Sequence, residues 1–195
     1  MSRLSQQHGY TLLELIIVVV ITSMLTLVLG TFLVNSLNTF QYATAQTNSA
    51  NDVLGILDRV GKVVRGATKV VSTGTSSLTI YGYFSPRDSV PDQITYAVSG
   101  TTFQSTDIPA SGTGPNYTYN AANGTTKTLT SNLAVGSTPI FTYYDDLGNQ
   151  LTGSFTTGQV KQIGIYIAVN PQPARVPIAI GNQIRVSLRN MKTNL

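Results

Sequence analysis

Residues 15–34 read LIIVVVITSMLTLVLGTFLV, a run of twenty residues that contains no charged side chain. Only threonine, serine and glycine interrupt its apolar character. A helix of about twenty residues spans the roughly 30 Å hydrocarbon core of a membrane. The stretch therefore predicts one membrane-spanning helix, and it decides how the rest of the chain is organised.

The charges around this run predict its orientation. Arg3 precedes the span, whereas the next charged residue after Glu14 is Asp52 and the next basic one is Arg59. Because positive charge favours the cytoplasmic side, we expect a short cytoplasmic N-terminus and the bulk of the chain outside.

The N-terminal flank differs from that of a secretory signal peptide. Such a peptide has an apolar region of about 7–15 residues that ends in an A-x-A-like cleavage site. Here the apolar run is longer, and no such pattern follows it. Instead, a polar leader over residues 1–9 abuts the run directly, and the junction at residues 9–14 reads GYTLLE.

This junction resembles the prepilin-type motif of type IV pilins, secretion-system pseudopilins and competence pilins. The family pattern is Gly, an aromatic residue, Thr, Leu, an aliphatic residue and Glu, followed by an apolar helix. The resemblance implies that prepilin peptidase cuts after Gly9 and methylates the new amino group of Tyr10. Two residues depart from the pattern, since Tyr10 replaces the usual Phe and His8 stands where Lys or Arg is common. Neither removes a group that cleavage needs, so we expect an effect on processing rate only.

Glu14 is the only acidic residue before the apolar run. A carboxylate at the centre of a bilayer costs about 2.5–3.5 kcal/mol on insertion scales, so a lone one is usually functional. The resemblance implies that Glu14 contacts the amine of a neighbouring Tyr10 as helices pack in a filament, where a low dielectric strengthens the charge pair. The structural alternative is a hydrated carboxylate at the membrane interface.

The helix is predicted to run over residues 10–67, because no proline occurs before Pro86. Residues 35–51 are uncharged and rich in the weak helix formers Asn and Thr. Beyond them, apolar side chains recur at helical spacing and form one stripe: Val53, Leu57, Val60, Val64 and Ala67. Gly66 is the expected end.

Basic residues fall on the face opposite this stripe: Arg59, Lys62, Arg65 and Lys69. The face has two interpretations, a patch for DNA or anionic lipid and an ordinary solvated helix face. Because the four charges are spaced out and Asp52 and Asp58 lie nearby, we favour the solvated face and expect no nucleic-acid partner. The net charge of +4 is too mild to indicate one.

From about residue 70 the apolar period changes to two, which predicts a β-rich domain over residues 68–195. The expected strands, separated by Gly, Pro, Asn and Asp, are 78–81, 93–98, 126–130, 139–144, 162–169 and 183–188. Together they predict one meandering antiparallel sheet packed on the amphipathic half of the helix, an α+β fold. Residues 109–124 show neither period and are expected to form a surface loop.

Residues 142–149 predict a strand that enters a tight turn, with Gly148 and Asn149 able to take positive φ. Asp145, Asp146 and Asn149 offer oxygen ligands for calcium. We favour the alternative that these side chains cap their own backbone. The C-terminal part, including residues 161–169 and 185–190, resembles larger minor pilins and J-type pseudopilins, which favours a minor or tip-proximal subunit.

Enzymatic function is not indicated. The chain has no cysteine, and its only histidine, His8, lies in the leader. We therefore predict no catalytic, cofactor-binding or metal-ligating residues, and no cofactor.

The predicted partners are prepilin peptidase, other pilin subunits through the N-terminal helix, the assembly machinery, and the membrane before assembly. We expect a single-pass cytoplasmic-membrane precursor, then a filament subunit at the cell surface or in the periplasm. Two alternatives stay open: a type II secretion pseudopilin, and a membrane-anchored surface binding module whose helix is never cleaved.

Overall fold

The computed structural model describes residues 10–83, 90–112, 117–134, 136–170 and 179–189. Helix α1 covers Leu12–Arg65, 54 residues. The chain forms two compact units, Met1–Thr44 and Ala45–Leu195, so α1 contributes to both. The weak helix formers after the apolar run do not interrupt α1. Hydroxyls there donate to backbone carbonyls one turn earlier, as Thr39 does to Asn35 at 2.9 Å.

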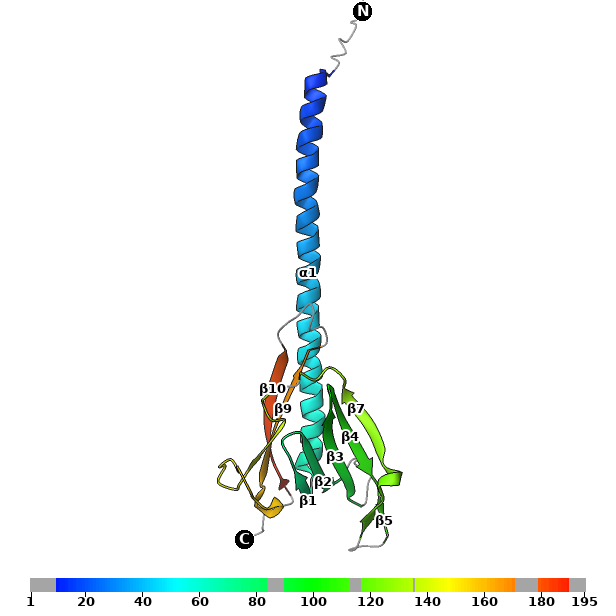
Figure 1. Cartoon of the computed structure of the whole chain (residues 1–195), viewed down its shortest axis with the longest axis vertical. Coiled ribbons are helices and arrows are strands. Elements are labelled where there is room, and N and C mark those ends of the chain that lie inside the picture. The colour runs from blue at the N-terminus through cyan, green and yellow to red at the C-terminus, as the bar shows by residue number, and fades with distance from the viewer. Residues whose placement is uncertain (1–9, 84–89, 113–116, 135, 171–178, 190–195) are drawn as a thin grey trace, which may run out of the picture. The chain divides into compact units, whose positions relative to one another are not determined.

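The second unit holds all the strands found in the described residues (Figure 1). Their bounds are β1 Lys69–Thr73, β2 Ser77–Gly82, β3 Asp92–Ser99, β4 Thr102–Ile108, β5 Ala110–Ser111, β6 Thr118–Tyr119, β7 Thr125–Thr130, β8 Phe141–Tyr144, β9 Gln162–Val169 and β10 Ile180–Ser187. Two 3₁₀ helices, η1 Ala121–Asn123 and η2 Thr157–Gln159, lie between strands.

These strands form three antiparallel sheets. A five-stranded sheet has the order β1-β2-β3-β4-β7, a three-stranded sheet has the order β10-β9-β8, and β5 pairs with β6. The α+β class predicted from the sequence is therefore confirmed, with one long helix followed by antiparallel sheets.

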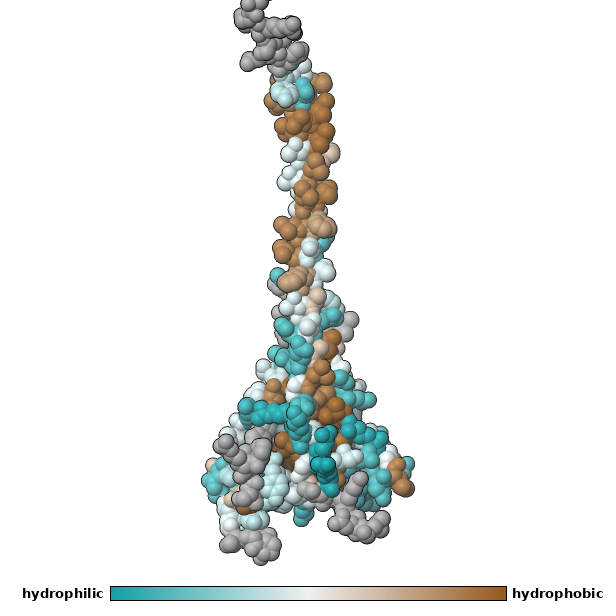
Figure 2. All heavy atoms as spheres, turned by 180° about the vertical axis from the view of Figure 1, so that it is seen from behind, coloured by the Kyte–Doolittle hydropathy of each residue, from teal (hydrophilic) through white to brown (hydrophobic). Residues whose placement is uncertain are grey.

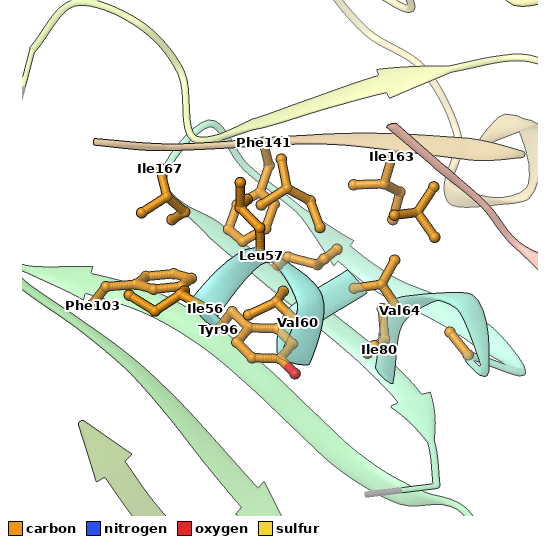
Figure 3. Close-up of a cluster of buried hydrophobic side chains, with 14 of the residues drawn as sticks. Ile56, Leu57, Val60, Val64, Ile80, Tyr96, Phe103, Phe141, Ile163 and Ile167 are labelled. Carbon is orange, nitrogen blue, oxygen red and sulfur yellow. The ribbon is translucent and has the colours of Figure 1, made fainter. Parts of the chain in front are cut away.

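The C-terminal part of α1 supplies the centre of the hydrophobic core. All five residues of the predicted apolar stripe are buried, each with at most 1% of its surface exposed. Figure 3 shows α1 residues in contact with side chains of the two larger sheets. Ile80 and Tyr96 come from the five-stranded sheet, and Ile163 and Ile167 come from the three-stranded sheet. The rings of Phe103 and Phe141 lie 6.3 Å apart and join the two sheets directly. The helix is thus covered on two sides.

The prediction of a single meandering sheet is wrong. Two of the larger sheet's strands, β1 and β4, were not predicted, because polar residues obscure their alternation. In β4 the buried face carries Ser105 as well as Phe103. The strands divide into separate sheets because the apolar stripe of α1 is buried against both.

The predicted surface loop at residues 109–124 is also wrong for the part that the structure describes. Residues 113–116 lie outside the described ranges. The remainder includes β5, β6 and η1. Tyr119 stacks on Tyr81 at 4.6 Å between ring centroids, and its hydroxyl donates to the Pro91 carbonyl at 3.0 Å. Aromatic packing anchors this segment to the five-stranded sheet, a long-range contact that the local sequence does not reveal.

Candidate functional site

The start of α1 is organised by Thr11. Its hydroxyl accepts a hydrogen bond from the backbone N–H of Glu14 at 3.3 Å, and its carbonyl accepts one from Leu15 at 3.2 Å. Thr11 is therefore the N-cap of the helix. The Thr-x-x-Glu spacing is that of a capping box, in which threonine caps the helix and glutamate occupies its third position.

The capping role of Thr11 was not predicted from the sequence, where this residue was identified only as part of the junction. The Thr-x-x-Glu spacing ahead of an apolar run was the signal that would have revealed it.

The predicted processing and assembly residues lie around this cap. Tyr10 is 83% exposed and precedes the helix, and Glu14 is exposed in the first helical turn. A carboxylate at this position interacts favourably with the helix dipole. Gly9 lies outside the described residues. The structure thus presents Tyr10 and Glu14 to solvent within one turn of the chain.

Hydroxyl groups within the apolar run bond to their own helix. Thr22 donates to the Val18 carbonyl at 2.7 Å, and Thr26 donates to the Thr22 carbonyl at 2.8 Å. Ser23 and Thr31 donate to carbonyls three residues earlier. An unsatisfied polar group costs several kcal/mol in a bilayer, so this internal bonding makes the run compatible with hydrocarbon.

The side chains of this part of α1 are outward-facing and apolar. Leu12, Leu27 and Phe32 are each at least 70% exposed. Figure 2 shows the hydrophobic colour extending along the helix of the first unit. In the described residues, one helix is long and apolar enough to cross a membrane. Its surface is suited to lipid or to the helices of other subunits.

The basic face predicted beyond the span is mainly a solvated helix surface. Lys62 forms an ion pair with Asp58 at 2.6 Å, and both side chains are more than 60% exposed. Arg65 is exposed as well and Arg59 is half-buried, whereas Lys69 lies beyond the end of α1, as the exposed first residue of β1. Exposed pairs of this kind contribute less than about 1 kcal/mol.

The turn at residues 145–149 is closed by hydrogen bonds between its own residues. Asn149 donates its backbone N–H to Asp145 Oδ1 at 2.8 Å and its side-chain amide to Oδ2 at 3.0 Å. The side-chain hydrogen bond from Asn149 is the main cause that lowers the pKa of Asp145. Of the two residues able to take a positive φ, Gly148 does so, with φ 87°, and Asn149 does not. This geometry matches the favoured self-capping interpretation, because both carboxylate oxygens already accept bonds from the turn.

The N-terminal segment is similar to a known family. Residues 4–30 match the model of the prokaryotic N-terminal methylation motif. The chain carries the type IV pilin and pseudopilin signature. Within this signature, Thr11 and Glu14 form the helix cap and residues 15–30 belong to the exposed apolar helix. No curated protein matches the chain.

The signature indicates a type IV pilin-like or pseudopilin subunit that is processed by prepilin peptidase and assembles with other pilin subunits. It points to a structural rather than an enzymatic protein family. The apolar helix and the motif fit a protein anchored in the inner membrane and later part of a pilus or pseudopilus.

Proposed function

We propose that this chain is a minor structural subunit of a type IV pilus-like filament that assembles through its N-terminal helix. The observation that carries the proposal is the coincidence of the methylation motif with an exposed apolar helix on the same segment. The helix is held in lipid before assembly and is transferred into a bundle of like helices afterwards. The apolar surface serves in both environments, so the transfer needs no change of fold.

Residues 1–9 are the leader in this proposal, with cleavage between Gly9 and Tyr10 and methylation at Tyr10. The support is the motif match together with the position of Tyr10 and Thr11, which precede the first helical turn. Mass spectrometry of the mature protein is expected to find a methylated Tyr10 at the N-terminus. Gly9→Leu should accumulate the precursor in the membrane. An intact Met1 on assembled protein would instead favour the uncleaved membrane anchor.

Glu14 is the proposed assembly residue, whose carboxylate pairs with the Tyr10 amine of a neighbouring subunit. Glu14→Gln tests this charge, because Gln is the other residue favoured at this capping-box position and the helix cap is retained. The variant should be cleaved normally, fold its outer domain and enter sheared filaments poorly.

Glu14→Asp is the matched control, since it keeps the charge on a shorter side chain. If Glu14→Gln enters filaments as well as wild type, helix packing suffices and the charge has no role in assembly. The cleaved N-terminus is measured in each case, because a processing defect must be separated from an assembly defect.

The pilus assignment is tested separately from assembly. Deletion of the chain should impair a surface filament, whereas a type II secretion pseudopilin would instead be needed for export of a secreted enzyme. The minor role predicts a low copy number relative to the main subunit in purified filaments, measured by quantitative mass spectrometry.

A further inference from the structure

The segment that joins η1 to β7 carries an Asn-x-Thr triplet, formed by Asn123, Gly124 and Thr125. An asparagine followed two residues later by serine or threonine is the sequence pattern of N-glycosylation acceptors in secreted proteins. The sequence contains one other such triplet, residues 116–118, which begins outside the described residues. Asn123 is therefore the triplet asparagine whose surroundings the structure describes.

The two polar residues of this triplet lie at the surface. Asn123 is the last residue of η1, Thr125 is the first residue of β7, and both are exposed. Gly124 between them has extended backbone, with φ −70° and ψ 136°. A Cβ atom added at Gly124 would lie 3.1 Å from the Ala121 carbonyl oxygen and 3.2 Å from Ile108 Cγ1. The chain thus packs closely at Gly124, while the side chains on either side of it are accessible to an enzyme.

The side chains of Asn123 and Thr125 make no hydrogen bond within the described residues, unlike those of their neighbours. The side-chain oxygen of Asn120 accepts a bond from the Ala122 N–H at 3.0 Å and caps η1. The hydroxyl of Thr126 lies 2.9 Å from the hydroxyl of Thr106, across the pair of strands β4 and β7. Polar side chains on both sides of the triplet therefore stabilise the fold, whereas the amide and the hydroxyl of the triplet are available for chemistry.

We propose that Asn123 is the acceptor of an N-linked glycan. Its side-chain amide nitrogen forms a bond to the anomeric carbon of a sugar diphosphate donor. The bond between that carbon and the phosphate oxygen breaks, the diphosphate leaves with the electron pair, and one amide proton passes to a base of the transferase. The hydroxyl of Thr125 is the group by which the transferase recognises the triplet. This inference rests on the proposed function, because it needs the second unit to be outside the cytoplasmic membrane.

A glycan at Asn123 stands beside the start of an edge strand. β7 is the last strand of the five-stranded sheet, so one of its edges has no partner strand among the described residues (Figure 1). Unpaired edges are templates for pairing with other chains, and proteins protect them with charge or with a cover. Lys127 is the only charged residue of this strand. A bulky, hydrated glycan therefore shields this edge from pairing between closely packed subunits.

The test uses the full-length chain purified from its native membrane and from sheared filaments. Trypsin cleaves after Arg87 and Lys127, so one peptide, residues 88–127, contains both triplets. The mass of this peptide should exceed its amino-acid mass by whole sugar residues, and fragmentation should place the addition on Asn123. Treatment with a glycan-releasing amidase should remove the sugar and leave aspartate at this position.

Substitutions then separate the triplet from its surroundings. Asn123→Gln and Thr125→Val should abolish the addition, whereas Thr125→Ser keeps the hydroxyl and should retain it. Thr126→Val is the matched control, because it removes a hydroxyl one residue further along β7 and should leave the addition in place. Asn116→Gln, which removes the other triplet, should leave it as well. Because Asn123 and Thr125 are exposed, their substitution does not disturb the core.

An unmodified peptide 88–127 from the mature protein would overturn the inference, as would an addition that persists in Thr125→Val. A sugar found only on a hydroxyl side chain, or only at Asn116, would overturn it too. Processed protein in sheared filaments with an unmodified peptide refutes this site but leaves the proposed function standing. A glycan at Asn123 on a chain that is never processed or assembled refutes the proposed function and leaves the site.

Discussion

Two glycines of α1 provide a matched test of the packing between the helix and β10. A Cβ atom added at Gly55 would meet nothing within 4 Å, whereas one added at Gly61 would lie 2.6 Å from Ile184 Cδ1. Alanine is favoured over glycine inside a helix by about 0.5–1 kcal/mol. Gly55→Ala should therefore stabilise the second unit by about that amount.

Gly61→Ala should have the same favourable effect on helix propensity, but steric crowding against Ile184 should cancel the resulting gain in stability. Carbon atoms pack favourably at about 3.5–4.0 Å, so Ile184 Cδ1 must move by about 1 Å. Overpacking of a core costs roughly 1–3 kcal/mol, and the free end of a flexible side chain favours the lower part of this range. The two variants should differ by about 1–3 kcal/mol, with Gly61→Ala the less stable.

The measurement is denaturant unfolding of the full chain in one detergent, followed by tyrosine fluorescence. Because both variants retain the same membrane span, the contribution of the span to the free energy of unfolding cancels when the two variants are compared. Ile184→Val, which removes Cδ1, should recover much of the Gly61→Ala defect in a double-mutant cycle. If Gly61→Ala is as stable as Gly55→Ala, the close packing of α1 on β10 is refuted.

Three further perturbations test separate parts of the structure. Tyr143→Phe removes a hydroxyl that donates to the Gly74 carbonyl at 2.8 Å and should cost about 1–2 kcal/mol in unfolding free energy. Burial raises the pKa of Tyr143 to about 12, so the neutral hydroxyl contributes fully to the free energy of unfolding below pH 10, and this contribution is lost as the pH rises toward 12. Between these pH values the stability of the wild type should fall more steeply than that of the variant. The lowered pKa of Asp145 predicts the opposite dependence of stability on pH. The hydrogen bonds of its carboxylate stabilise the turn above the ordinary pKa of aspartate and are lost as the pH falls through the lowered pKa. In an NMR titration, the amide signal of Asn149 should therefore change at a pH below the usual aspartate range. Thr11→Val removes the helix cap and should cost about 1 kcal/mol locally, seen as faster amide hydrogen exchange at Glu14; Thr11→Ser should retain protection, and equal exchange in both variants would contradict the capping role.

The short-range features of this protein were predictable from its sequence. The apolar run, the processing motif and the buried stripe of α1 each depend on spacing within a few helical turns, where hydrogen bonding and side-chain periodicity are local. The match at residues 4–30 supports the family resemblance, and the predicted stripe is confirmed by the burial of its members, which are Val53, Leu57, Val60, Val64 and Ala67.

The partition of the strands required the tertiary structure. Polar residues weaken the alternation of β1 and β4, and these strands form because long-range pairing supplies their hydrogen bonds. The same holds for the pocket lined by Thr75, Val98 and Ala168, because these residues come from segments far apart in the sequence. The sequence alone determined the helix and its membrane character through local periodicity, whereas the division of the strands into three sheets depended on contacts between distant segments, which periodicity does not encode.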